Sequence, residues 1–211
     1  MKILVCISKT PDTTAKIAFT EGNTKFDENG VQWIINPFDE WYALVRAIEM
    51  KEQDPAVTIH LVTVGEADAE PIIRKALALG GDEAIRINIQ SNDSFVVASQ
   101  IAAIAKEGGY DLILTGKETI DYNSASIGSM LSAILDLPLV SLANQLDLNG
   151  NTATVRREIE GGEAHHPQRA ARRRGCHRHL HLHRRTCDRA HSGGALLLVL
   201  RRRSGEGRQG A

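Results

Sequence analysis

Short apolar runs alternate with longer amphipathic segments up to about residue 145. The short runs are rich in β-branched residues, as in strands that are buried on both faces. In the longer segments the apolar positions recur every three to four residues, which is the spacing of a helix that packs one face on a core. The predicted strands are 2–8, 31–35, 56–64, 84–89, 111–116 and 137–148, and the predicted helices are 37–52, 68–79, 95–107 and 124–136.

Turn and cap signals divide these segments. Asn36 is expected to cap the first helix, with Pro37 at its first helical position. Gly80-Gly81 closes the second helix. Asn149-Gly150 predicts a hairpin that leads into one further strand.

This alternation predicts an α/β domain with a doubly wound, mostly parallel sheet and helices on both faces. Ligands of such sheets bind beyond the carboxyl ends of the strands, at the point where the strand order reverses. Three loops are expected at that edge, namely 8–12, 65–68 and 117–126. The default expectation is therefore a nucleotide site.

The segment 115–131, TGKETIDYNSASIGSML, is the most informative of these loops. A strand ends at Gly116, and a run of small residues from Ser124 to Gly128 then opens a helix. Small residues let backbone N–H groups approach an anion at the positive end of the helix dipole, so a phosphate fits, although an ordinary capped helix start accounts for the pattern equally well. Neither a Walker A motif nor GxGxxG occurs in the sequence.

Candidate catalytic groups are few. The sequence shows no plausible triad, and His60 within a strand is expected to be structural. Cys6 is interpreted as a small buried hydrophobe, and Lys117 is as plausible a surface lysine as a phosphate partner. An enzyme with catalytic side chains is therefore not expected.

The amino-acid composition limits the cellular compartments in which the protein is expected. The sequence has 42% hydrophobic residues and no stretch near the roughly 20 apolar residues of a membrane span. The three cysteines, an odd number without framework spacing, favour a reducing compartment. We therefore expect a cytoplasmic protein that does not insert into membranes.

Charge divides the chain into two parts. Residues 1–162 hold 13 Lys and Arg against 23 acidic residues, a net charge of −10. Residues 163–211 hold 12 Arg, no Lys and 3 acidic residues, a net charge of +9, together with seven of the eight histidines. A composition rich in Arg and His without Lys is typical of GC-rich DNA read out of frame. We interpret 1–162 as the α/β domain, incomplete at its C-terminal end, and 163–211 as a disordered or frameshifted tail.

Two other interpretations of the tail are weaker. Zinc sites need ligands that converge from a packed scaffold, and the alternate histidines between Cys176 and Cys187 do not indicate one. The arginine runs could bind phosphates without specificity, but any Arg-rich peptide would do so, and no nucleic-acid partner is expected.

Four stretches resemble the electron transfer flavoprotein beta family, over about three quarters of the chain. They are MKILVCISKTPDT (1–13), INPFDEWYALVRAIEMKE (35–52), IIRKALALGGDEAIRI (72–87) and DLILTGKETID (111–121). VRREIEGG (155–162) resembles the start of a later family signature, after which the family's strand and long arm are not recognisable.

The resemblance implies a fold like that of the adenine-nucleotide α-hydrolase group and pairing with a larger alpha subunit. It implies FAD shared with that subunit, AMP buried in this one, acyl-CoA or other dehydrogenases as donors, and an acceptor such as a quinone oxidoreductase. Phe38 is expected nearest the flavin. The implied cofactor-binding residues are Cys6, Asn36, Pro37, Phe38, Asp39, Val64, Gly116, Lys117, Glu118, Thr119, Ile120, Asp121, Tyr122, Asn123, Ser124, Ala125, Ser126 and Ile127.

Three alternatives stay open. A bifurcating-type subunit would hold a second FAD in place of AMP, and the loop residues Tyr122-Asn123-Ser124 are compatible with it. A module like the universal stress proteins would carry a glycine-rich ATP loop, which is not found. An ATP pyrophosphatase would carry SGGxDS after the first strand, where this sequence has Ser8-Lys9-Thr10-Pro11.

Overall fold

A computed structural model describes residues 1–149, 152–169 and 196–200. The strands are β1 (Lys2–Cys6), β2 (Lys9–Pro11), β3 (Phe19–Thr20), β4 (Lys25–Phe26), β5 (Trp33–Ile35), β6 (Thr58–Val64), β7 (Glu83–Ile87), β8 (Leu112–Gly116), β9 (Leu139–Asn149), β10 (Thr152–Ile159), β11 (Gly162–Arg169) and β12 (Leu196–Leu200). The helices are α1 (Asp39–Gln53), the 3₁₀ turn η1 (Ala67–Ala69), α2 (Glu70–Leu79), α3 (Ser94–Gly108) and α4 (Ile127–Leu135).

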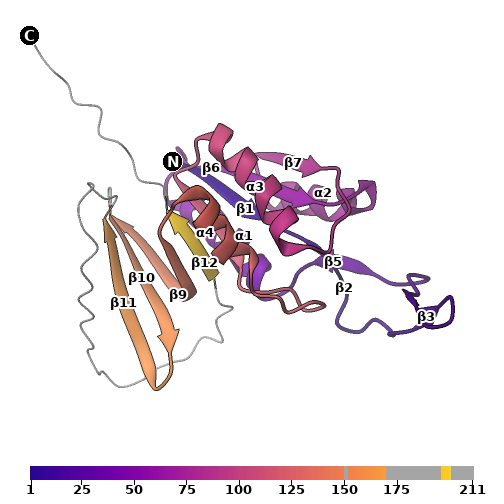
Figure 1. Cartoon of the computed structure of the whole chain (residues 1–211). Helices are drawn as coiled ribbons and strands as arrows, with labels where there is room; N and C mark the ends of the chain where they lie inside the picture. Colours follow the sequence, from indigo (N-terminus) through magenta and orange to yellow (C-terminus); the bar gives the residue numbers. More distant parts are fainter. Residues whose placement is uncertain (150–151, 170–195, 201–211) are drawn as a thin grey trace, which may run out of the picture.

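The main sheet has a parallel centre and an antiparallel extension (Figure 1). Its order is β11-β10-β9-β12-β8-β1-β6-β7, and the last four of these strands run parallel. The chain passes from β1 to β6 and β7 on one side and then returns to β8 on the other side of β1. The strand order therefore reverses between β1 and β8. The predicted doubly wound α/β sheet is confirmed.

Helices cover both faces of this centre, and β1 serves two cores at once. Ile3 and Val5 belong to the core under α1 and α2, while Leu4 and Cys6 belong to the core under α3 and α4. Strand side chains alternate between faces, so a continuous apolar run is what a doubly covered strand requires. Each fully buried Leu, Ile or Val contributes roughly 1.5–3 kcal/mol of transfer free energy.

The start of α1 differs from the prediction. Asn36 does not cap the helix, because α1 begins at Asp39 and Phe38 occupies the cap position. Phe38 has φ 65° and ψ −80°, and the N–H of Asp39 donates to the carbonyl of Pro37 at 2.9 Å. These values define a γ-turn with positive φ, which is the rarer and more strained form. The tight turn frees Asn36 for the contacts described below.

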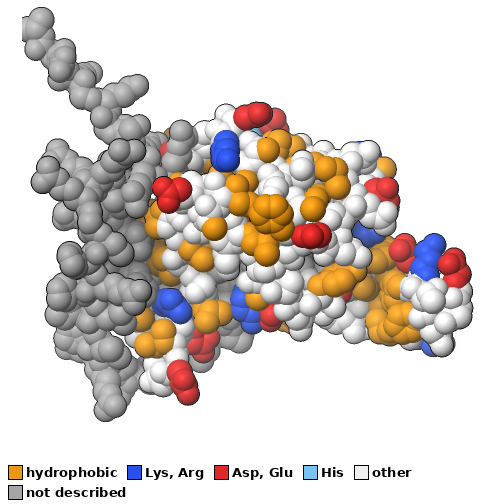
Figure 2. All heavy atoms as spheres, viewed as in Figure 1, with side chains coloured by type: hydrophobic (Ala, Val, Ile, Leu, Met, Phe, Trp, Pro, Cys, Tyr) orange, Lys and Arg blue, Asp and Glu red, His pale blue; other side chains and the backbone are white. Residues whose placement is uncertain are grey.

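The segment between β1 and α1 forms two small antiparallel sheets. β2 pairs with β5, and β3 pairs with β4 in a hairpin that projects from the domain (Figure 1). Apolar side chains gather around this projection (Figure 2), where Ile17 and Phe19 are both more than half exposed.

The strands β9, β10 and β11 form a meander that continues the sheet beyond β12. The predicted turn at Asn149-Gly150 falls partly outside the described residues, but Asn149 and Thr152 pair across it. The region 163–211 contributes most of β11 and all of β12, which runs antiparallel to β8. No helix among the described residues is long and apolar enough to cross a membrane.

Candidate nucleotide site

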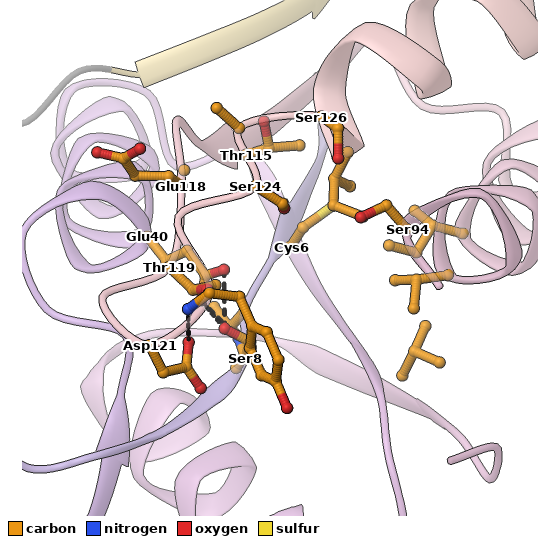
Figure 3. A pocket seen from close by; sticks show the side chains of 18 of the residues that line it. Cys6, Ser8, Glu40, Ser94, Thr115, Glu118, Thr119, Asp121, Ser124 and Ser126 are labelled. Carbon is orange, nitrogen blue, oxygen red and sulfur yellow. Dashed lines mark hydrogen bonds between the residues drawn. The ribbon is translucent and has the colours of Figure 1, made fainter. Parts of the chain in front are cut away.

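A cavity of about 270 Å³ opens at the carboxyl edge of the sheet, where the strand order reverses between β1 and β8 (Figure 3). It lies between the ends of β1, β6 and β8, the first turns of α1 and α3, and the loop 117–126. This position is the one expected for a ligand of a doubly wound sheet. The volume is close to the lower limit of small-molecule sites.

The walls of the cavity combine apolar and hydroxyl-bearing side chains. One group is apolar or weakly polar and can contact the faces of a planar ring. Its members are Cys6, Val62, Val64, Val97, Ile101 and Ile127. The other group can exchange hydrogen bonds with a sugar or a phosphate. Its members are Ser91, Asn92, Ser94, Ser124 and Ser126.

The side chain of Glu40 extends from the first turn of α1 into the cavity and hydrogen-bonds to Ser8, just beyond the end of β1. The Ser8 N–H donates to its Oε2 at 2.5 Å, and the Ser8 hydroxyl lies 2.9 Å from each carboxyl oxygen (Figure 3). Glu40 is 8% exposed. Burial raises its pKa from 4.5 to about 8, partly opposed by the hydrogen bonds from Ser8, while Asp121 and Asp39 raise it further. The carboxyl is thus mostly neutral near pH 7, which lowers its repulsion of an anionic ligand.

Gly116 allows α1 to approach the end of β8. A Cβ at this position would lie 2.7 Å from Cγ of Glu40 and 3.0 Å from Cβ of Asp39. Carbon atoms that are not bonded to each other do not approach this closely without strain. A residue with a side chain would therefore force α1 or the end of β8 to shift, and packing requires glycine at this position. The close approach places the Glu40 carboxyl beside the loop that follows β8.

Asn36 and Asp39 hold that loop in place. The amide of Asn36 donates to the carbonyl of Glu118 at 2.8 Å and accepts from the N–H of Ile120 at 3.1 Å. A carboxylate oxygen of Asp39 accepts from the N–H of Glu118 at 3.1 Å. Asn36 is fully buried, so these bonds satisfy groups that have no access to water.

Beyond Asp121 the loop is tightly turned and enters α4. Asn123 and Ala125 both have positive φ, at 51° and 49°, which is uncommon for alanine. The helix begins at Ile127, three residues later than the predicted start at Ser124, and no side chain caps its first turn. The first N–H groups of a helix have no partner within it. Ser126 and Ile127 line the cavity, so this end of α4 borders it.

The lysines near the cavity are already paired. Lys117 lies 2.7 Å from a carboxylate oxygen of Glu118, which raises the Lys117 pKa. Lys9 forms an ion pair with Asp68, and its ammonium lies 3.9 Å from the centre of the Trp33 ring. Both lysines border the cavity, but each is paired with a carboxylate and is not held in place to bind a phosphate.

Most of the predicted site residues come together. Those that line the cavity are Cys6, Val64, Gly116, Lys117, Glu118, Thr119, Asp121, Tyr122, Ser124, Ala125, Ser126 and Ile127. Those that do not are Asn36, Pro37, Phe38, Asp39, Ile120 and Asn123. Apart from Asn36, these border a second hollow, which shares Lys117 and Glu118 with the cavity. Phe38 is 59% exposed there.

The sequence prediction missed several residues of the cavity. Glu40 and Thr115 each adjoin a predicted position, and Ser8 lies two residues beyond Cys6, so all three could have been found by extending each motif by one or two residues. Ser91 and Asn92, which precede α3, and Ser94 at its start gave a weaker signal, namely a polar loop after the parallel strand β7 at the same sheet edge.

Other titratable groups have structural surroundings. Burial, and next the charge of Glu40, raises the pKa of the Cys6 thiol far above its ordinary value, so the thiol is unreactive. His60 lies against Tyr110, with its Nδ1 3.2 Å from the phenol oxygen and 3.3 Å from a carboxylate oxygen of Glu83. Within the described ranges, no group of three or more His, Cys, Asp or Glu could hold a metal ion. The tail histidines between Cys176 and Cys187 lie outside them.

Fold and cavity together define a doubly wound α/β protein with a candidate ligand site at the reversal of strand order. The sequence model of the electron transfer flavoprotein domain family matches residues 23–173, and the chain belongs to this family.

Curated relatives agree with this assignment. The chain is 38% identical over 165 residues to the electron transfer flavoprotein subunit beta of Bacillus subtilis, covering 76% of this chain and 63% of that protein. It is 32% identical over 167 residues to the human subunit beta, covering 77% and 65%. It is also 32% identical over 166 residues to the caffeyl-CoA reductase-Etf complex subunit CarD of Acetobacterium woodii, covering 77% and 63%. The chain therefore matches a little under two thirds of the length of these relatives.

Proposed function

We propose that this chain is the beta subunit of a heterodimeric electron transfer flavoprotein and binds AMP in the cavity between β1 and β8. The observation that carries the proposal is the position and lining of that cavity. It lies where the strand order reverses, with apolar walls for a base and hydroxyl groups for a ribose phosphate. AMP has both parts.

Different residues of the cavity contact the base and the phosphate of AMP in this proposal. Val62, Val64 and Ile101 offer the apolar surface for the base. The first turn of α4 offers backbone N–H groups to the phosphate. Glu40, being mostly neutral near pH 7, does not repel it strongly. A nucleotide bound there stabilises the folded state by mass action and needs no turnover.

The chain itself is then an electron carrier subunit rather than an enzyme. FAD, held mainly by an alpha subunit, supplies the redox chemistry. This chain contributes position and packing, and the exposed Phe38 is the residue proposed to lie nearest the flavin. Electrons pass from acyl-CoA or other dehydrogenases to an acceptor such as a quinone oxidoreductase, and the complex works in the cytoplasm.

A second FAD in place of AMP is the competing occupant. One relative is named as a subunit of a caffeyl-CoA reductase-Etf complex, so the family includes members of larger complexes. FAD contains AMP and a flavin mononucleotide, and it needs about twice the volume of AMP. The cavity of about 270 Å³ favours the mononucleotide.

The proposal is tested by thermal unfolding of the full-length chain, from which any bound nucleotide has first been removed, with and without added nucleotide. AMP at 100 times its dissociation constant should add about 2.7 kcal/mol to the free energy of unfolding. That corresponds to a rise in Tm of roughly 5–10 °C for a protein of this size. Equal Tm values with AMP, with FAD and without nucleotide would refute binding in this cavity. A rise with FAD alone would favour the competing occupant.

A further inference from the structure

Two buried threonine hydroxyls have no hydrogen-bond partner within the part of the chain that the structure describes. They belong to Thr10 and Thr115, which are 0% and 2% exposed. Of the two, Thr115 lines the cavity and Thr10 does not. A third buried threonine, Thr63, is 3% exposed, and its hydroxyl donates to the carbonyl of Ile7 at 3.0 Å.

The position of Thr115 in β8 explains why its side chain meets the cavity. Ile113, two residues earlier, packs in the core under α3 and α4 together with Cys6. Side chains two apart on a strand share a face, so Thr115 lies on the Cys6 side of the sheet. Val5 and Leu114 are paired in register, which places Cys6 and Thr115 side by side at the strand ends. Figure 3 shows Thr115 near the loop that bears Glu118 and Ser126.

A buried hydroxyl without a partner is costly, because it has lost its bonds to water and gained nothing in exchange. Valine has almost the same shape and would avoid this cost at position 115. A hydroxyl retained at the floor of a cavity is therefore explained by a ligand that completes its bonding. Thr10 has the same cost away from the cavity, and no ligand accounts for it.

We propose that the Thr115 hydroxyl hydrogen-bonds the nucleotide that fills the cavity and thereby strengthens its binding. This inference rests on the proposed function. A threonine hydroxyl both donates and accepts, so a ribose hydroxyl and a polar edge of the purine are both suitable partners. The apolar neighbours of Thr115 cannot take that role, so its contribution is distinct from theirs.

Three isosteric substitutions in the full-length chain test the assignment. Thr115→Val should weaken AMP binding about three- to tenfold, the usual worth of one neutral hydrogen bond, and raise the Tm without nucleotide by about 2–4 °C. Thr63→Val should do the reverse, lowering the Tm by about 2–4 °C and leaving AMP affinity unchanged. Thr10→Val should raise the Tm without changing affinity. Thr115→Ser, which keeps the hydroxyl, should bind AMP as the wild type does.

Calorimetric titration with analogues identifies the group that is bound. If the hydroxyl meets the ribose, 2′-deoxy-AMP should bind wild type and Thr115→Val with equal affinity. If it meets the 6-amino group of the base, purine riboside 5′-monophosphate, which lacks that group, should bind the two proteins with equal affinity. Either result supports the assignment.

Failure of the inference can be told apart from failure of the proposed function. Wild type that binds no AMP would refute the function. Wild type and Thr115→Val that bind AMP equally well, with the Tm differences as above, would refute only the role of Thr115.

Discussion

Glu40 is the most unusual residue of the site, because a carboxyl group lies almost fully buried at the floor of a cavity that suits an anion. The folded-state pKa of about 8 exceeds the ordinary 4.5. Between these pH values the folded protein holds a proton that the unfolded chain has released. The free energy of unfolding is therefore undiminished below about pH 4.5. It falls by up to about 1.4 kcal/mol per pH unit and levels off above about pH 8.

Glu40→Gln should remove this pH-dependent part of the free energy of unfolding, since the amide oxygen still accepts from Ser8 and carries no charge. Urea unfolding between pH 5 and 8 should show a steeper loss of stability in the wild type than in the variant. Glu49→Gln, half exposed on the same helix, serves as the control and should keep the wild-type slope. Parallel profiles for wild type and Glu40→Gln would show that Glu40 ionises normally in the folded state.

Gly116 makes a second prediction at the scale of one residue. Gly116→Ala places a methyl group 2.7 Å from Cγ of Glu40, so either α1 or the end of β8 must shift. Overpacking of this kind costs about 1–3 kcal/mol of unfolding free energy. Gly162→Ala, which meets nothing within 4 Å, should change stability by less than about 0.5 kcal/mol. Equal denaturation midpoints for the two variants would contradict the packing argument.

At the scale of elements, the loop 117–126 depends on a helix start far away in sequence. Asn36 bonds to two backbone groups of this loop and is fully buried. In Asn36→Ala, the Glu118 carbonyl and the Ile120 N–H lose their partners, at a cost of about 1–3 kcal/mol each if they stay buried. The loop should therefore open.

Hydrogen exchange measures this opening. Amides of residues 117–123 should exchange faster in Asn36→Ala, while those of β1 and β6 keep their protection. Asn29→Ala is the matched control, because the Asn29 side chain bonds to Asp27 in an exposed turn away from the loop. Unchanged exchange in 117–123 would mean that Asp39 and the loop's own bonds suffice.

The sequence predicted strands and helices well where one local pattern sets them. The apolar run of β1 and the periodic spacing of α1 and α3 need no distant information. The start of α1 was wrong, because Asn36-Pro37 matches a cap motif locally. The γ-turn at Phe38 and the loop contacts of Asn36 depend on β8, some 80 residues away.

As with the helices and strands, the parts of the candidate site that depend on local patterns could be predicted from the sequence. Strand ends and small residues indicate a nucleotide edge, and the resemblance to a family supplied the loop 116–127. The inward orientation of Glu40, the unpaired hydroxyl of Thr115 and the contribution of α3 arise only when separate elements pack together. The first two have no local signature, and the third gave only the weak signal of a polar loop before α3.

At the scale of the whole molecule, the sheet combines a parallel centre, which carries the candidate site, with an antiparallel side. We propose that 163–211 is the product of a reading-frame shift, because its 12 arginines, absent lysine and seven histidines do not match the acidic domain before it. Resequencing the gene decides this point, and an intact frame through codon 211 would refute it.

The same proposal predicts weak assembly. If 163–211 lacks the family's own C-terminal arm, apolar surface that would be buried in the heterodimer stays exposed. On co-expression with an alpha subunit, the chain should be poorly recovered in the complex and the flavin absorbance should be low. A flavin-loaded heterodimer with one copy of each chain would contradict this prediction.

The central claim is that the edge of the sheet between β1 and β8 holds an adenylate as a fixed part of the fold. The most direct measurement is to denature the purified full-length chain and identify the released nucleotide by chromatography. The account predicts AMP in about equimolar amount. Release of ATP, or of no adenine nucleotide from chain that is correctly folded, would contradict it.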